Sequence, residues 1–151
     1  MDHAPTLAVC VAGELRSATC TPSRAPAEHR RIASPIDSIV SWLSGLGMAH
    51  DIFAALDNPP VASAMQRVLT GLRPRAVSFT NASEAQTSFE HDVRNMMCIK
   101  PSAYFQARKL QACWRLIVAR EREVRREYEH VVRLRPDLMM PYTLAGKWRC
   151  T

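Results

Sequence analysis

The sequence predicts an α/β fold in which a mainly parallel β-sheet is flanked by helices. Three observations support this fold class: four short apolar segments, helical segments between them, and one long amphipathic helix before the last apolar segment. The expected strands cover residues 7–12, 51–56, 76–80 and 131–135. The expected helices cover residues 35–44, 58–71, 83–97 and 103–129. Alternation of this kind is typical of parallel strands connected by helical crossovers.

The first strand is a continuously apolar run, Leu7–Ala12, of the kind found in strands buried on both faces. It ends at Gly13, and residues 17–35, rich in Ser, Pro, Ala and Arg, are expected to form a long loop. Ser34 can cap the first helix, and Pro35 suits its first position. The apolar residues that follow recur at i, i+3, i+4 and i+7, which places them on one helix face.

The middle of the chain repeats the unit of strand and helix. The second strand stops at Asp57 and Asn58, and Asn58 with Pro59 can start a helix that ends at Gly71. The third strand is shorter, and the helix after it has a weaker apolar pattern. Pro101 then separates this helix from the long one.

The long helix over 103–129 is amphipathic. Its core face is expected to comprise Ala107, Leu110, Trp114, Ile117, Glu121, Val124 and Tyr128. The opposite side carries a basic ridge, which comprises Arg108, Arg115, Arg122 and Arg126. The last strand follows directly and is ended by Pro136.

Length and composition fit a single globular domain over residues 1–151. With 47% hydrophobic and 23% charged residues, the chain falls outside the range of disordered proteins. No run approaches the roughly 18 apolar residues of a membrane helix, and the N-terminus lacks the pattern of a secretory signal. We therefore expect no membrane segment and, by default, a cytoplasmic chain.

The five cysteines and five histidines show none of the spacings that bind zinc. Cys10 lies in the first strand and Cys113 in the long helix. Both are expected to be small, buried side chains in the reduced state.

The charge is basic and local. The chain has 20 Lys and Arg against 14 Asp and Glu, a net charge of +6. Residues 108–135 alone contain nine basic and four acidic residues, a balance of +5. Seventeen of the 20 basic residues are arginine, whose planar fork suits phosphate, although GC-rich coding explains the same bias.

Ligands of parallel α/β sheets bind beyond the carboxyl ends of the strands, so the residues after the expected strands are site candidates. These candidates are Gly13 to Arg16, Asp57 with Asn58, Asn81, and Arg133 to Asp137. Gly13 belongs to neither the dinucleotide-binding nor the phosphate-loop motif, which disfavours dehydrogenases and kinases of those types. It permits close approach of a ligand, or it serves only a strand-to-loop turn.

Arg133, Arg135 and Asp137 form the most suggestive group. Strand alternation puts the two arginines on one face, where they repel each other unless they share an anion or carboxylates. A diphosphate would serve as that anion. Asp137 lies just beyond Pro136 and could bind Mg²⁺ or Mn²⁺. A structural ion pair at the strand end explains the same spacing.

Four stretches within residues 7–140 together match the sequence pattern of a known protein family. They are the strand ending in Gly13-Glu14-Leu15-Arg16, the strand Asp51-Ile52-Phe53 with Asp57, the helix opening with Tyr104-Phe105-Gln106, and the segment from Tyr128 to Asp137. The last stretch follows the pattern Y-[DE]-x-[VI]-[VI]-R-x-R-x-D. With these stretches the chain resembles the N-terminal part of glycosyltransferase-like proteins that have the GT-A-type nucleotide-sugar fold.

The resemblance implies that the chain binds a nucleoside-diphosphate sugar. It places nucleotide contacts at Gly13 and Arg16 with Asp57 nearby, and the diphosphate or metal site at Asp137, aided by Arg133 and Arg135. Arg135 replaces the first acid of the usual D-x-D motif, so either Mn²⁺ or Mg²⁺ or arginine would neutralise the diphosphate. The resemblance also implies that the sheet is cut after its fourth strand, without the acceptor-binding half and the catalytic base.

Two other functions remain open. The basic ridge on the helix 103–129 could bind nucleic acid, although interleaved glutamates disfavour this interpretation. Alternatively, the chain is a non-catalytic structural domain that depends on a partner. A sheet cut after its fourth strand would have an open apolar edge, through which we expect self-association.

Overall fold

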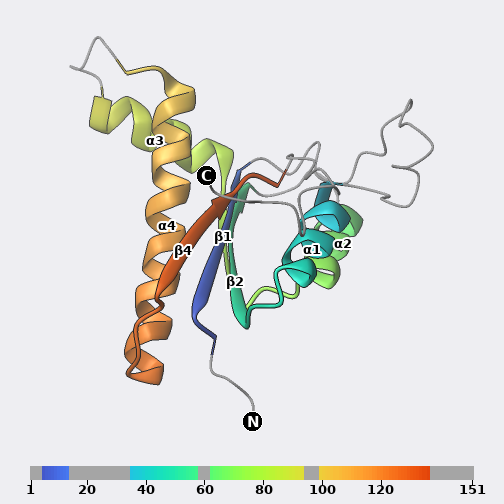
Figure 1. Cartoon of the computed structure of the whole chain (residues 1–151). Helices are drawn as coiled ribbons and strands as arrows, with labels where there is room; N and C mark the ends of the chain where they lie inside the picture. The colour runs from blue at the N-terminus through green and yellow to red at the C-terminus, as the bar shows by residue number, and fades with distance from the viewer. Residues whose placement is uncertain (1–4, 14–34, 58–61, 94–98, 137–151) are drawn as a thin grey trace, which may run out of the picture.

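The computed structural model describes residues 5–13, 35–57, 62–93 and 99–136. These residues form a four-stranded, all-parallel sheet with helices on both faces (Figure 1), which confirms the predicted fold class. The strands are β1 (Leu7–Gly13), β2 (His50–Asp57), β3 (Ala76–Thr80) and β4 (His130–Leu134). The helices are α1 (Pro35–Gly45), α2 (Ala62–Leu72), α3 (Ala82–Val93) and α4 (Pro101–Val124).

The sheet has the strand order β3-β2-β1-β4, so the chain reverses direction across the sheet after β3. Helices α1 and α2 cover one face and α4 covers the other, while α3 packs beside α4 (Figure 1). The carboxyl ends of all four strands meet at one edge. The carboxyl ends of β1 and β4 flank the point where the strand order reverses, which is the usual ligand site of such sheets.

Two separate hydrophobic clusters hold these layers together. Val9 and Val11 of β1 face α1 and α2, whereas the alternate residues of β1 face α4. The α4 side of the sheet is lined mainly by small residues, with Phe53 as the large exception; they are Ala8, Cys10, Ala12 and Ala55. Small side chains let the helix lie close to the strands, and this close contact fixes which face of α4 is buried.

The buried face of α4 differs from the predicted one. Lys109, Cys113 and Ile117 are buried, whereas Trp114 is 55% exposed and Val124 is 42% exposed. A helix packed closely on alanine-lined strands leaves no room for an indole ring, so Cys113 occupies the contact instead. The four arginines of the basic ridge are exposed as predicted.

Helix α4 also ends five residues earlier than predicted. Arg125 adopts a left-handed conformation, with φ of 54°, and closes the helix after Val124. Tyr128 therefore lies in the loop before β4, where its ring packs edge-on against Phe53 at 5.9 Å between centroids. The backbone N–H of Tyr128 donates to the Glu121 carboxylate at 2.9 Å. Glu121 thus stabilises the turn between α4 and β4 instead of forming part of the hydrophobic core.

A disulfide joins Cys10 of β1 to Cys113 of α4, with 6.0 Å between the Cα atoms. Both side chains are buried, as predicted, but the expectation that they are reduced is wrong for this structure. The bond joins residues 103 positions apart and ties α4 to the central strand. By restricting the unfolded chain, a bridge of this span stabilises the fold.

The remaining boundaries agree closely with the prediction. Every predicted strand lies within a residue of the observed one, and α1 begins at Pro35 as expected. Helices α2 and α3 overlap the predicted segments, and the predicted helical residues 58–61 and 94–97 lie outside the described residues. The expected loop over 17–34 and the capping residue Ser34 lie outside the described residues. Among the described residues, no helix combines the length and the apolar character needed to cross a membrane.

Candidate functional site

A pocket of about 300 Å³ lies at the carboxyl edge of the sheet. Figure 1 shows that α3 and the first turns of α4 extend beyond this edge, so the pocket is enclosed by the ends of β2 and β3 and by these two helices. Its lining residues are Asp57, Thr80, Ala85, Gln86, Ser102, Phe105, Gln106, Arg108 and Lys109. Of the predicted site residues, the structure places Asp57 in this pocket.

Asp57 and Lys109, which both line the pocket, form an ion pair in which Lys109 is buried and Asp57 is half-buried. The Lys109 ammonium lies 2.8 Å from one carboxylate oxygen of Asp57 and donates a hydrogen bond to the other at 2.9 Å. Lys109 is only 5% exposed, because it shares the buried face of α4 with Cys113, one turn further on. A buried ammonium requires a partner, and the last residue of β2 supplies it.

Arg133 lies at the same edge, on the α4 side of the sheet. Val132 and Leu134 pack in the α1/α2 cluster, so alternation along β4 points Arg133 to the other face. Its guanidinium donates a hydrogen bond to the side-chain oxygen of Gln106, which also lines the pocket. Arg135 is exposed and follows the end of β4. Of the two predicted arginines, Arg133 therefore adjoins the pocket through Gln106.

Gly13 has a structural explanation. A Cβ atom at this position would lie 2.7 Å from the Cδ atom of Pro136, closer than real Cβ contacts allow. The absence of a side chain lets the ends of β1 and β4 approach each other, so Pro136 covers the glycine on that side. The predicted ligand approach at Gly13 thus competes with a proline ring already in place. Arg16 and Asp137 lie outside the described residues.

The pocket does not provide the donor set of a divalent cation. Among the described lining residues, Asp57 is the only carboxylate, and both of its oxygens face the Lys109 ammonium. Across the described part of the chain, no group of three or more His, Cys, Asp or Glu side chains could hold a metal ion. The predicted metal ligand Asp137 is not among those residues, so metal binding there stays a prediction.

A hydrogen-bonded chain that the sequence reasoning missed stands beside the pocket. Arg108, one of its lining residues, donates to the Tyr104 hydroxyl at 3.1 Å, and Tyr104 donates to the Asp92 carboxylate at 2.5 Å. The bond from Tyr104, helped by His91, holds the pKa of Asp92 below its usual value. The spacing of Tyr104 and Arg108, four residues apart on the long helix, is the signal that could have revealed the pair.

The charge of the pocket favours an anionic ligand. Its lining includes one acid and two basic side chains, and Asp57 neutralises Lys109, so Arg108 is left as the excess charge. Thr80, Ser102 and Gln86 add hydroxyl and amide groups that can bond to ligand oxygens. The arrangement suits a polar ligand that carries negative charge.

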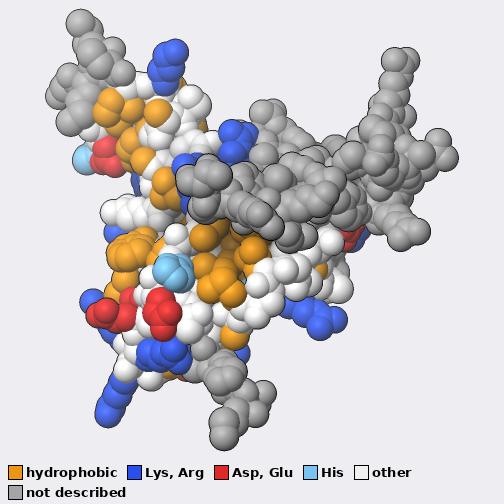
Figure 2. Space-filling view, in the orientation of Figure 1, with side chains coloured by type: hydrophobic (Ala, Val, Ile, Leu, Met, Phe, Trp, Pro, Cys, Tyr) orange, Lys and Arg blue, Asp and Glu red, His pale blue; other side chains and the backbone are white. Residues whose placement is uncertain are grey.

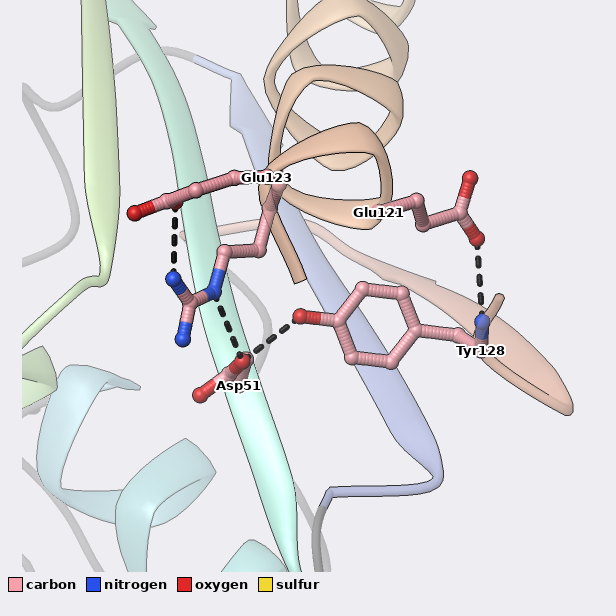
Figure 3. Close-up of polar contacts among 5 residues, drawn as sticks. Asp51, Glu121, Glu123 and Tyr128 are labelled. Carbon is pink, nitrogen blue, oxygen red and sulfur yellow. Dashed lines mark hydrogen bonds and ion pairs between the residues drawn. The ribbon is translucent and has the colours of Figure 1, made fainter. Parts of the chain in front are cut away.

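The opposite, amino edge of the sheet contains a second polar network (Figure 3). The Tyr128 hydroxyl donates to Asp51 at 2.6 Å, while Arg120 lies 3.9 Å from Asp51 and donates to Glu123 at 2.7 Å. Burial, followed by the bond to Asp51, raises the pKa of Tyr128 well above its usual value. These contacts join the end of α4 to the start of β2, although the buried Nε atom of Arg120 forms no hydrogen bond among the described residues.

A larger pocket, of about 470 Å³, lies near this amino edge between the ends of α1 and α2. Its lining includes His50 and Arg73 but no predicted site residue. Ligands of parallel α/β sheets bind at the carboxyl edge, so the smaller pocket is the stronger candidate.

The basic ridge and the β4 edge form the remaining notable surfaces. Interleaved glutamates neutralise part of the charge beside the ridge; Glu129, for example, lies 4.0 Å from Arg126. Figure 2 shows apolar side chains gathered over the face that includes β4. The exposed large hydrophobic residues include Val131 of β4 and Trp114 of α4. Strand β4 is an edge strand of the described sheet, so this patch flanks an open edge.

Comparison of the chain with protein-family models, with curated protein sequences and with solved structures found no match.

Proposed function

We propose that this chain binds a nucleoside-diphosphate sugar at the carboxyl edge of its sheet, as part of a glycosyltransferase-like protein. The observation that carries the proposal is the pocket at this edge, where the buried pair of Asp57 and Lys109 lies beneath polar side chains and an excess arginine. The pocket lies at the carboxyl edge, along which parallel α/β sheets bind nucleotides, at the ends of β2 and β3 rather than at the switch point between β1 and β4. Its size suits part of such a ligand, with the rest extending along the edge toward Arg133.

The charge of each residue indicates which part of the ligand it would contact. Lys109 holds the Asp57 carboxylate in place, and the remaining lone pairs of its oxygens can accept hydrogen bonds from ligand hydroxyl groups. Arg133, placed on the α4 side of β4, supplies positive charge for a diphosphate. Sugar transfer develops negative charge on the departing diphosphate, which arginine stabilises. Donor binding is the step that these residues support.

Thermal unfolding and isothermal calorimetry with defined ligands test the proposal. UDP, GDP and their sugars at millimolar concentration should raise the melting temperature, with and without Mn²⁺, whereas uridine and guanosine should have smaller effects. A ligand present at 100 times its Kd stabilises by about 2.7 kcal/mol. For a chain of this length that corresponds to a rise of roughly 5–11 °C.

A matched pair of variants links any binding to the pocket. Asp57→Asn changes the pocket carboxylate, whereas Asp37→Asn makes the same change at an exposed position on α1. We expect weaker nucleotide binding in the first and unchanged binding in the second. If no nucleoside diphosphate shifts the melt of the wild-type chain at millimolar concentration, the proposal is wrong.

A further inference from the structure

Arg108 differs from the other arginines of the basic ridge in what surrounds it. Its guanidinium lies 5.8 Å from the centroid of the Tyr104 ring and donates to the hydroxyl of the same residue at 3.1 Å. Tyr104 in turn donates to Asp92 of α3. Arg115, two turns along the same ridge, is also exposed but lines none of the pocket.

We propose that Arg108 is the phosphate-binding residue of the pocket, and that Tyr104 and Asp92 are positioning residues that hold its guanidinium at the pocket wall. The class of ligand rests on the proposed function, because a nucleoside diphosphate is the phosphate compound expected there. The assignment itself rests on the geometry of the described residues, and it concerns an arginine that the sequence pattern placed only in the basic ridge.

Positioning matters because a free arginine side chain is mobile. Ordering such a side chain on a ligand costs up to about 2 kcal/mol of rotamer entropy. The bond to Tyr104 and the contact with its ring hold Arg108 in place before any ligand arrives. Only one of the five guanidinium N–H groups is used by Tyr104, so others remain to donate to phosphate oxygens.

The tyrosine is itself fixed by its neighbours. Its ring contacts Phe89 of α3 and Phe105 of α4 at centroid distances of 5.3 and 5.9 Å. Because the hydroxyl donates its only proton to Asp92, it can face Arg108 solely as an acceptor. The carboxylate therefore fixes the direction of both bonds.

The charges around Arg108 leave it available to an anion. Within the pocket, Asp57 already bonds to Lys109, which removes the one acid that could compete for Arg108. Asp92 attracts the guanidinium from outside the lining, but its side chain is 52% exposed, so water screens that attraction. A phosphate group entering the pocket would be the closest available partner.

A purely structural role for the same chain makes a different prediction. A network that only joins α3 to α4 would affect stability when broken, with equal effects on phosphorylated and unphosphorylated ligands. A phosphate-binding role changes the affinity only for ligands that carry phosphate. The decisive measurement is therefore the dependence of affinity on the phosphate, not the stability of the fold.

The experiment compares four chains by isothermal calorimetry: the wild type, Arg108→Gln, Tyr104→Phe and the control Arg115→Gln. The ligands are UDP, UMP, uridine and inorganic pyrophosphate. Charged hydrogen bonds contribute about 1.5–3 kcal/mol, so Arg108→Gln should weaken UDP and pyrophosphate about 10-fold or more. Uridine should change less than about 2-fold, since it forms no charged bond to the arginine. Tyr104→Phe should give a smaller loss confined to the phosphorylated ligands, and Arg115→Gln should match the wild type.

Each outcome separates the inference from the proposed function. If UDP binds to the wild type and Arg108→Gln retains full affinity for UDP and pyrophosphate, the inference is overturned while the proposed function stands. If pyrophosphate binds through Arg108 but no nucleoside diphosphate binds more tightly, the proposed function falls and the phosphate site stands. If the wild type binds neither, both are overturned. Circular dichroism melts of each variant confirm that Arg108 and Tyr104 can be replaced without unfolding the chain.

Discussion

The ion pair between Asp57 and Lys109 offers the sharpest test of the structure. Asp57→Ala removes the partner that the described residues provide to an ammonium buried on the inner face of α4. Breaking a buried pair by removing one member costs about 3–5 kcal/mol, because the other charge is left without compensation. The Asp57 side chain is 31% exposed, so water can replace part of it, and we expect a loss near the lower limit, about 3 kcal/mol.

Replacing Lys109 alone, and replacing both residues, separates the cost of burying an unpaired charge from the attraction between the two charges. Lys109→Met leaves Asp57 at the pocket, where water can solvate it, so we expect a loss of only about 1 kcal/mol. In Asp57→Ala/Lys109→Met no charge is buried alone, and stability should return to within about 1 kcal/mol of the wild type. If the pair is kept for ligand binding, this double variant folds well but no longer binds nucleoside diphosphates.

Urea unfolding followed by circular dichroism measures these free energies, and thermal melts give a second reading. A loss of about 3 kcal/mol should lower the melting temperature by roughly 6–12 °C for a domain of this length. Asp37→Ala, at an exposed position on α1, controls for the loss of an acid as such. If Asp57→Ala lies within about 1 kcal/mol of the wild type, or if the double variant is no more stable than Asp57→Ala, then Lys109 does not depend on Asp57 and the reasoning is wrong.

Three further predictions concern the packing around the site. Tyr128→Phe should lower the free energy of unfolding in urea by about 2 kcal/mol. It should also reduce the loss of stability above pH 10, because Tyr128 in the unfolded chain ionises near its usual pKa of 10.0 while the folded residue keeps its proton. Tyr104→Phe, which removes an exposed hydrogen bond, should change the stability little. Gly13→Ala should cost about 1–3 kcal/mol through overlap with Pro136, and an unchanged melt would refute that contact. The open edge at β4 should cause concentration-dependent self-association in light scattering, and Trp114→Ser should weaken it; a monomer at high concentration would contradict this.

The sequence was sufficient for the strands because each is a short apolar run bounded by turn residues. The continuous run of β1 indicates burial on both faces, and every residue of this strand is buried in the structure. Alternation of strands with helices then restricts the sheet to parallel pairing. The strand order was beyond this reasoning, since periodicity within a segment carries no information on which strand lies beside which.

Helix α4 shows where periodicity fails. The pattern through Leu110, Trp114 and Ile117 describes an apolar face, yet the contact with the sheet passes through Lys109, Cys113 and Ile117. The choice depends on the small residues of the facing strands, which lie about a hundred positions away in the chain. The same distance hides the disulfide, because Cys10 and Cys113 become neighbours only once α4 lies on β1.

The candidate site was predicted in part for the same reason. Asp57 was found because it ends β2, and Arg133 because it lies near the end of β4, on the other side of β1. Lys109 and Arg108 were not predicted as site residues. Which side chains of α4 lie at the carboxyl edge depends on how far the helix is shifted along the sheet, and the sequence does not show this. Site residues on strands can be predicted from where the strands end, whereas site residues on helices can be identified only from the tertiary structure.

The axial position of α4 is set by a pair of matched contacts with β2. Strand β2 has an aspartate near each end, and each faces a basic residue of α4: Asp57 pairs with Lys109, and Asp51 lies near Arg120. Eleven helical residues span about 16 Å, and six strand residues span about 20 Å, so flexible basic side chains bridge the small difference. The two pairs have the same chemistry but different surroundings. Both aspartates line a pocket, but Asp51 also accepts a hydrogen bond from Tyr128, whereas the described partner of Asp57 is Lys109 and this pair lines the pocket that we propose as the ligand site.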